Sequence, residues 1–175
     1  MKKLFVILFL LYGCKQEAID PSLGMVKGST NATAWEKPKI RSTFYFGLCS
    51  SKKIDLRTDI HIGPGLNSIG INILHIPPAV GTYKVSLNSS GGANCSNIRA
   101  GLYLSNYDAP IDQVYVLEKP SFANRITISR VDTVANIMEG NFQILFGDSE
   151  NKERVLPDTV LVTAEFKVPI TRLDL

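Results

Sequence analysis

The sequence predicts an all-β domain, and three observations lead to this prediction. From residue 40 onward, apolar residues recur at every second position in one short run after another, the pattern of a strand with one buried face. Clusters of Gly, Pro, Asn and Ser separate these runs, as chain reversals require. Apolar residues at helical spacing do not stand out anywhere. About nine such strands predict an antiparallel β-sandwich or a closed β-barrel-like domain.

The first four strands are expected between residues 40 and 87. Turn-forming residues separate them at Ser50-Ser51 and at Gly63-Pro64-Gly65, and Pro77-Pro78 ends the third. A short fourth strand is expected at residues 82–87. The apolar-face positions of the first three strands are Phe44, Phe46 and Leu48, then Ile54, Leu56, Thr58, Ile60 and Ile62, then Ile69, Ile71 and Ile73.

The remaining five strands are expected after a polar, glycine-rich loop at residues 88–97. Asp108-Ala109-Pro110 is a predicted turn, and Pro120 closes the strand that follows it. Gly140 is expected to permit a backbone conformation or a close approach that other residues forbid. The apolar-face positions are Ile98, Ala100, Leu102 and Leu104, then Val114 and Val116, then Ile126 and Ile128, then Phe142, Ile144 and Phe146, and last Val160, Val162, Ala164, Phe166 and Val168.

The N-terminus predicts a lipoprotein signal peptide. Lys2 and Lys3 precede an unbroken apolar run at residues 4–11, far shorter than the roughly 20 residues that span a bilayer. The run ends in Leu11-Tyr12-Gly13-Cys14, which is similar to the bacterial lipobox. Because a thiolate is nucleophilic enough to accept a diacylglyceryl group, Cys14 is the expected lipidation site, and its acyl chains would anchor the protein to a membrane. The alternative is an ordinary signal peptide that is cleaved elsewhere.

We therefore expect residues 1–13 to be the signal peptide, residues 14–33 the lipidated Cys and a flexible tether, and residues 34–175 the all-β domain. The tether is predicted because its residues include few large apolar side chains. Trp35 is expected to begin the domain as a plug at one end of the sheets. Two of the three excess positive charges belong to Lys2 and Lys3, so no nucleic-acid partner is predicted.

Two further Cys residues form a candidate disulfide. Cys49 and Cys95 are an even pair in a chain that is expected to be exported to an oxidising compartment. A bond between them would stabilise the fold by about 4 kcal/mol through the loop that it closes. The alternative is that they are free thiols. Neither belongs to a CxxC motif, so no zinc or redox site is predicted.

No catalytic residue, metal ligand or cofactor site is predicted. The only histidines, His61 and His75, could share a metal with Asp55 or Asp59, but they lack the spacing of known metal motifs. The same two acids, and the pair Asp108 and Asp112, have the composition for glycoside chemistry, but surface acids on strands and turns are far commoner. No GxSxG motif or phosphate-binding glycine loop occurs. We therefore expect a protein that is not an enzyme.

Tyrosines on the polar faces are the better indication of binding. Tyr45 and Tyr103 fall opposite apolar runs, and Tyr107 and Tyr115 lie near expected turns. Exposed tyrosine suits contacts with carbohydrate or protein. The alternative is that these rings pack between the sheets or under loops.

Several stretches resemble a family of small bacterial lipoproteins known only as a domain of unknown function. The resemblance implies an all-β, lipid-anchored domain, and it implies no activity. The stretches are NRITISRVD at residues 124–132, MEGNFQILF at 138–146, the run from Val160 to Val168, Gly81-Thr82-Tyr83, Asn106-Tyr107, and residues 32–35.

The expected function is that of a membrane-anchored bacterial lipoprotein whose β domain binds or scaffolds without catalysis at the cell envelope. The outer membrane is the favoured location, with its leaflet and side left open. An envelope hydrolase and a carrier of a small apolar ligand are the alternatives. The first needs acids, or a histidine and an acid, that converge in a cleft, and the second needs a dry interior cavity.

Overall fold

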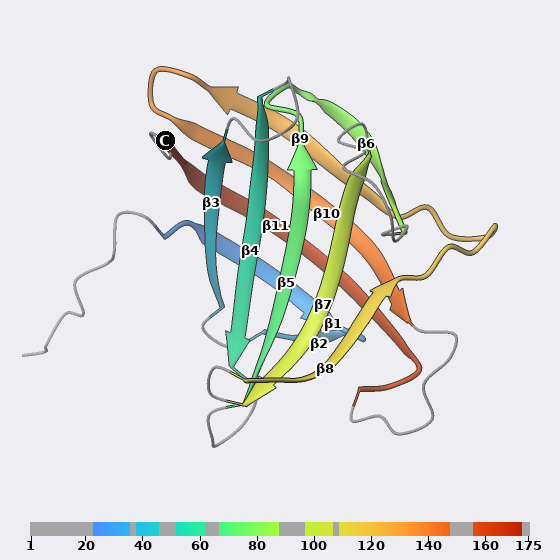
Figure 1. The fold of residues 1–175 in the computed structure, drawn as a ribbon. Helices are drawn as coiled ribbons and strands as arrows, with labels where there is room; N and C mark the ends of the chain where they lie inside the picture. Colours follow the sequence, from blue (N-terminus) through green and yellow to red (C-terminus); the bar gives the residue numbers. More distant parts are fainter. Residues whose placement is uncertain are drawn as a thin grey trace, which may run out of the picture.

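The computed structural model describes residues 23–35, 38–45, 52–61, 67–87, 97–106, 109–147 and 156–172. These residues form eleven strands in one sheet and no helix, so the all-β prediction is confirmed (Figure 1). The sheet has more strands than expected. It is mixed, not antiparallel, because β11 runs parallel to β3 and β6 runs parallel to β7.

The strands range from two residues in β2 to 14 in β11. Their bounds are β1 Met25–Thr30, β2 Thr33–Ala34, β3 Lys39–Tyr45, β4 Lys53–His61, β5 Asn67–Ile76, β6 Gly81–Ser86, β7 Ile98–Asn106, β8 Ala109–Val116, β9 Arg125–Asp132, β10 Ile137–Gly147 and β11 Thr159–Arg172.

The strands lie in two layers. Figure 1 shows β3, β4, β5 and β7 crossing in front of β1, β10 and β11. Three strand pairings connect the edges of the two layers: β3 with β11, β7 with β6, and β8 with β10. Followed from strand to strand, the pairings form a circuit in the order β11, β3, β4, β5, β7, β6, β9, β10 and back to β11.

The core lies between the layers and is one continuous apolar cluster. The expected alternation is confirmed in β4, β5, β7, β8, β9, β10 and β11, where the predicted apolar-face residues that the structure describes are buried. The side chains of four further predicted residues lie outside the described part of the chain: Phe44, Phe46, Leu48 and Ile62. The largest fully buried side chains include Phe142, Phe146 and Met138. Phe142 and Phe166 pack with ring centroids 6.3 Å apart.

The folded domain begins earlier than expected, so the assignment of residues 14–33 to a flexible tether is wrong at its C-terminal end. β1 pairs antiparallel with β11 from Met25 to Thr30. The strand buries only Val26 among its apolar residues, so it lacks the alternating pattern from which the other strands are predicted. Trp35 packs against the core beside Gly28, as its predicted role requires, and its indole N–H donates to the Thr30 hydroxyl at 2.8 Å.

Gly140 permits the close approach that was predicted for it. A Cβ atom there would lie 2.2 Å from the backbone oxygen of Thr127 on β9. The β9–β10 register shifts at this point, and the Ser129 hydroxyl donates to the Glu139 carbonyl at 3.1 Å. Gly140 is therefore required by a β-bulge and not by a left-handed backbone conformation.

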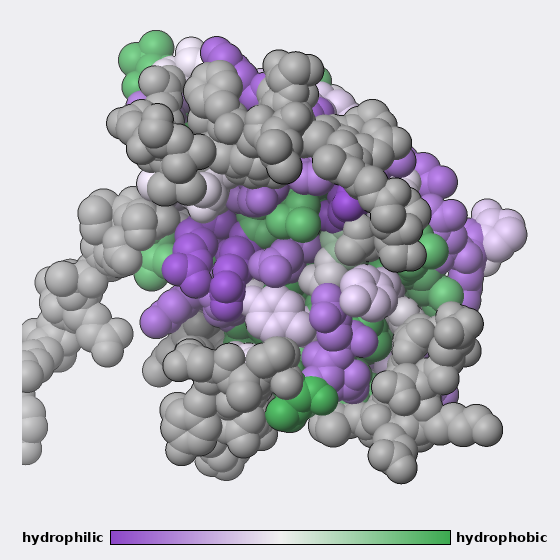
Figure 2. Space-filling model, viewed as in Figure 1, coloured by the Kyte–Doolittle hydropathy of each residue, from purple (hydrophilic) through white to green (hydrophobic). Residues whose placement is uncertain are grey.

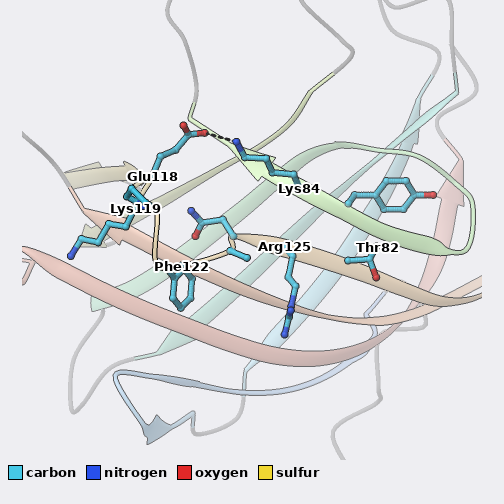
Figure 3. Close-up of a pocket in the computed structure, with 10 residues that line it drawn as sticks. Thr82, Lys84, Glu118, Lys119, Phe122 and Arg125 are labelled. Atoms are coloured by element: carbon cyan, nitrogen blue, oxygen red, sulfur yellow. Dashed lines mark ion pairs between the residues drawn. The ribbon is translucent and has the colours of Figure 1, made fainter.

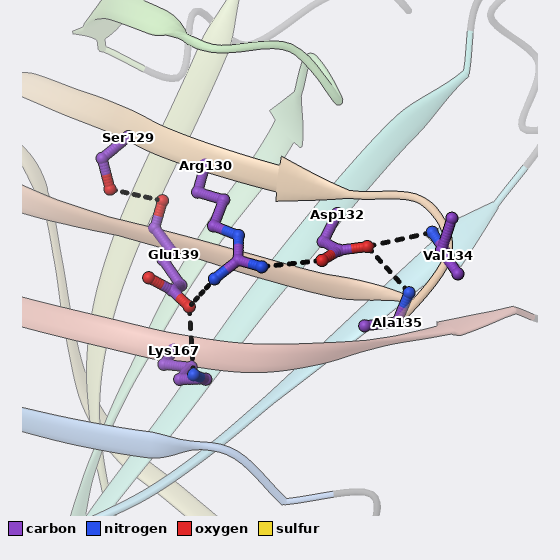
Figure 4. Close-up of polar contacts among 7 residues, drawn as sticks. All are labelled: Ser129, Arg130, Asp132, Val134, Ala135, Glu139 and Lys167. Atoms are coloured by element: carbon purple, nitrogen blue, oxygen red, sulfur yellow. Dashed lines mark hydrogen bonds and ion pairs between the residues drawn. The ribbon is translucent and has the colours of Figure 1, made fainter.

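The β9–β10 hairpin is held by a network of charged side chains (Figure 4). Arg130 contacts Asp132 at 2.7 Å and Glu139 at 3.5 Å, and Glu139 contacts Lys167 on β11 at 3.1 Å. Asp132 also accepts the backbone N–H groups of two turn residues, Val134 and Ala135. The Ala135 N–H and then the Arg130 hydrogen bond lower the pKa of Asp132 below its ordinary value.

The three cysteines lie outside the described residues. Lipidation of Cys14 and a bond between Cys49 and Cys95 therefore stay predictions. The part of the chain that the structure describes contains no helix long and apolar enough to cross a membrane.

Candidate functional site

The outer face of the β3–β4–β5–β7–β8 layer contains four residues that sequence analysis singled out: Asp55, Asp59, Tyr103 and Tyr115. We call it the arginine face. Its side chains alternate with the buried ones: in β4, Ile54, Leu56, Thr58 and Ile60 point into the core, and the residues between them point outward. Figure 2 shows hydrophilic side chains gathered over the middle of this face.

Strand register aligns these outward residues in two rows that cross the layer. One row is Lys39, Asp59, Gly70, Tyr103 and Gln113. The next row is Arg41, Arg57, Asn72, Gly101 and Tyr115. Arg41 and Arg57 are thus directly opposite each other on neighbouring strands, an arrangement that like charges alone would destabilise.

Asp59 offsets the repulsion between the two arginines. The Arg57 Nε–H donates to Asp59 Oδ1 at 3.1 Å, and an Arg41 Nη–H donates to Asp59 Oδ2 at 3.5 Å. Asp59 is 26% exposed, whereas the two arginines are about half exposed at 51% and 48%. One carboxylate therefore positions two guanidinium groups that remain open to solvent.

Tyr103 lies flat over the backbone of Gly70. A Cβ atom on Gly70 would lie 1.9 Å from the phenol ring, so only glycine fits beneath it. The Tyr103 hydroxyl donates to Asp59 Oδ1 at 3.4 Å, and the Arg57 guanidinium carbon lies 5.5 Å from the ring centroid. Burial, and then the charge of Asp59, raise the pKa of Tyr103 above its ordinary value, against the opposing effect of the arginines. The phenol therefore stays protonated and remains a donor.

A shallow hollow of about 530 Å³ lies beside this cluster. Four residues with hydrogen-bond donors line it, together with Leu56 and Leu74: Arg41, Arg57, Asn72 and Thr43. Asp55 also lines the hollow, and its Oδ1 accepts the backbone N–H of His75 at 2.8 Å. The hollow therefore combines several hydrogen-bond donors with a carboxylate that is already engaged.

The described part of the arginine face has an excess of positive charge. The outward acids are Asp55 and Asp59. The outward basic residues are Lys39, Arg41, Lys53, Arg57 and Arg99. An anionic ligand would therefore meet a favourable potential here.

The described residues do not bring Asp55 and Asp59 together as a glycosidase pair. Asp55 and Asp59 lie four residues apart on one strand, which is about 13 Å and more than the roughly 5–9.5 Å between paired glycosidase acids. Asp112 instead accepts the N–H of Leu156 at 2.9 Å, and its partner Asp108 lies outside the described residues. Among the residues that can be described, no three His, Cys, Asp or Glu side chains are grouped as a metal site would need.

The structure describes only some of the histidine and tyrosine side chains that were considered as site residues. His75 lies in a bulge at the end of β5 with a positive φ of 66°, and the side chain of His61 lies outside the described residues. Tyr115 is exposed on the arginine face and Tyr103 is partly buried there. The side chain of Tyr45 and all of Tyr107 fall outside the described part of the chain.

Sequence analysis missed the two arginines. Alternation alone indicates that Arg57 points outward, since it lies between Leu56 and Thr58. It does not indicate that Arg41 lies opposite, because this depends on the register between β3 and β4.

Comparison with known proteins identifies no relative. No protein-family model matches the chain, and neither a curated protein nor a solved structure does.

Proposed function

We propose that this chain is a lipid-anchored protein of the bacterial cell envelope whose β domain binds anionic groups, without catalysis, through the arginine face. The anchor is Cys14, at the end of the apolar N-terminal run. The ligand class is an oxyanion, either a phosphate or a carboxylate, on a partner protein or an envelope polymer. The resemblance to small bacterial lipoproteins agrees with this proposal and supplies no activity of its own.

The observation that carries the proposal is the pair of guanidinium groups at the edge of the hollow. Each guanidinium has five N–H donors, and among the described residues each uses one donor on Asp59. The remaining donors are suited to the two-point recognition of a phosphate or carboxylate that arginine provides. Asn72 and Thr43 supply further polar contacts beside them.

The site is also preorganised, which lowers the entropic cost of binding. Asp59 and the Tyr103 ring hold Arg57 from two directions. Gly70 supports Tyr103 from below. The side chains therefore need little rearrangement before a ligand arrives.

The filled interior favours an outer surface over a lumen as the binding site. Large side chains between the layers, among them Phe146, Ile40 and Leu102, are less than 2% exposed. We infer further that the sheet closes in a barrel-like way, because the pairings return from β10 to β11 and the Ser42 hydroxyl donates to the Pro169 carbonyl beside the β3–β11 margin. Such a packed barrel has little room for an apolar ligand.

A titration of the full chain in detergent with inorganic phosphate and with acetate tests the proposal. NMR signals of the arginine side chains report which guanidinium groups respond. We expect the Arg57 Nε–H signal to shift on binding, and we expect Arg57→Gln to weaken binding about tenfold, the scale of one lost charge-assisted hydrogen bond.

Lys39→Gln is the matched control, since it removes one positive charge from the same face outside the hollow. It should weaken binding much less than Arg57→Gln. Equal losses in the two variants would mean that the face attracts anions only through its net charge. Such a result, or an absence of any shift at Arg57, would refute a specific site.

A further inference from the structure

The opposite layer also presents a polar outer face, and strand register again orders it into rows. The row nearest the β8–β9 loop is Lys84, Arg125, Gln143, Thr163 and Ser29. The neighbouring row is Thr82, Thr127, Asn141, Glu165 and Lys27. Every one of these side chains is polar. Because they cross five strands, the rows extend over about 19 Å.

Two hollows on this face meet at Arg125, and we call them together the Arg125 groove. The first, of about 760 Å³, lies between β6 and the β8–β9 loop and is bordered by Lys84, Lys119 and Phe122 (Figure 3). The second, of about 460 Å³, lies over β1, β11 and β10 and is bordered by Asn141, Gln143 and Thr163. Arg125 lines both, so the two hollows adjoin at this side chain.

The loop that forms one wall of the groove is held firmly. The Asn124 side chain donates to the Leu117 carbonyl at 3.0 Å and accepts the Leu145 N–H at 2.7 Å. Asn124 is 4% exposed, so both bonds are shielded from water. A backbone bridge between Lys119 and Phe122 closes the turn. The backbone at Phe122, whose side chain lines the first hollow, is therefore held in place.

The charges in the groove are unevenly compensated. Lys84 is paired with Glu118 at 3.5 Å, and Glu165 lies opposite Lys27 in the register. Within the described ranges, neither Arg125 nor Lys119 forms an ion pair. The junction of the two hollows therefore carries a positive charge that suits an acidic group on a ligand.

The floor of the groove offers both donors and acceptors. The Ser29 and Thr163 hydroxyls are 3.0 Å apart, and those of Thr82 and Thr127 are 3.1 Å apart. The amides of Asn141 and Gln143 make no hydrogen bond to any other described side chain or backbone group, so both ends of each amide can serve a ligand. A sugar chain presents hydroxyl groups of this dual character on every ring.

We propose that the Arg125 groove binds an extended acidic oligosaccharide, with a carboxylate at Arg125 and a sugar ring against Phe122. An extended peptide fits less well, because it usually pairs with a sheet edge and places alternate side chains in pockets. This face is the middle of a sheet whose backbone is already paired. The site lies on the layer opposite the arginine face and does not depend on it.

Calorimetric titration of the full chain in detergent with a galacturonate hexasaccharide tests this proposal. Two comparison ligands complete the set. A neutral glucose hexasaccharide has sugar rings without carboxylates, and hexaglutamate has carboxylates without sugar rings. We expect the acidic sugar to bind at least tenfold more tightly than either, because both the carboxylates and the hydroxyl groups contribute. Arg125→Gln should weaken its binding about tenfold. The double variant Asn141→Ala and Gln143→Ala should also weaken it.

The titrations are made in the Arg57→Gln background, so that the anion site proposed on the other layer does not contribute, and Lys167→Gln is the control because it removes a positive charge from the same layer outside the groove. No binding of the acidic sugar would overturn the proposal. Hexaglutamate binding as tightly as the sugar would overturn it in favour of an acidic protein partner. Equal losses in Arg125→Gln and Lys167→Gln would reduce the effect to overall charge. Circular dichroism of each variant confirms that a loss of binding is not a loss of fold.

Discussion

At the scale of single residues, the arginine face depends on Tyr103. The ring covers Gly70, the hydroxyl donates to Asp59, and the face of the ring receives Arg57. Each contact requires a neutral phenol or an intact ring. The same residue thus links the packing of the face to the position of the guanidinium that we propose binds a ligand.

The raised pKa of Tyr103 predicts a loss of stability at high pH. The unfolded phenol ionises near pH 10, while the folded one resists ionisation because burial and Asp59 disfavour the phenolate. Its contribution is therefore complete below about pH 10 and is lost as pH rises through the folded pKa. Tyr103→Phe keeps the ring over Gly70 and removes the ionisation.

Urea unfolding of wild type and Tyr103→Phe at a series of pH values measures this contribution. The difference between their unfolding free energies should be constant below about pH 10 and should move in favour of the Phe variant above it. A difference that stays constant to the highest pH at which both proteins fold would show that Tyr103 is not shielded as described.

At the scale of secondary-structure elements, the β-bulge between β9 and β10 requires glycine at residue 140. Gly140 and Gly101 are both strand glycines, yet only the first is enclosed. A Cβ atom on Gly140 would lie 2.2 Å from a backbone oxygen, whereas one on Gly101 would meet nothing nearer than the Gln113 side chain at 3.6 Å. Backbone atoms cannot move aside as a side-chain end can.

Gly140→Ala should therefore lower the free energy of unfolding by about 1–3 kcal/mol, the usual cost of overpacking. Gly101→Ala is the matched control and should be neutral or slightly stabilising, because Gly in a strand interior is itself unfavourable. Urea denaturation of the two variants gives both values. Similar stabilities for the two would contradict the bulge geometry assigned to Gly140.

The sequence predicted the elements better than their arrangement. Alternation identified which residues of β4 and β11 face the core, since burial of one face imposes a period of two on each strand separately. It did not reveal β1, which buries Val26 and otherwise carries Lys27, Ser29 and Thr30 on partly exposed positions. β1 is held to β11 by backbone hydrogen bonds, so it can form with few apolar side chains of its own.

The candidate site was predicted only in part for a related reason. Tyr103 was recognisable because an aromatic residue on a polar strand face is unusual. The partnership of Arg41 with Arg57 depends on the register between two strands, which no local pattern specifies. The Arg125 groove joins residues from five strands, so it depends on the strand register, which alternation does not specify.

At the scale of the whole molecule, the two layers present two different surfaces. The arginine face offers compact anion recognition, and the Arg125 groove offers two adjoining hollows. The first strand of the sheet begins at Met25, and Gly24 before it pairs with Ile40. Fewer residues than expected therefore separate the proposed anchor at Cys14 from the first strand, which would keep both surfaces close to the membrane.

The most direct measurement of the lipid anchor is the mass of the N-terminal peptide of the full chain, produced in a bacterium and extracted from its membranes. We predict that the protein begins at Cys14 and that this residue carries a diacylglyceryl thioether. A Cys14→Ser variant should remain unprocessed and take up no labelled palmitate. A free thiol at Cys14, or a mature N-terminus beyond it, would contradict a lipid-anchored protein.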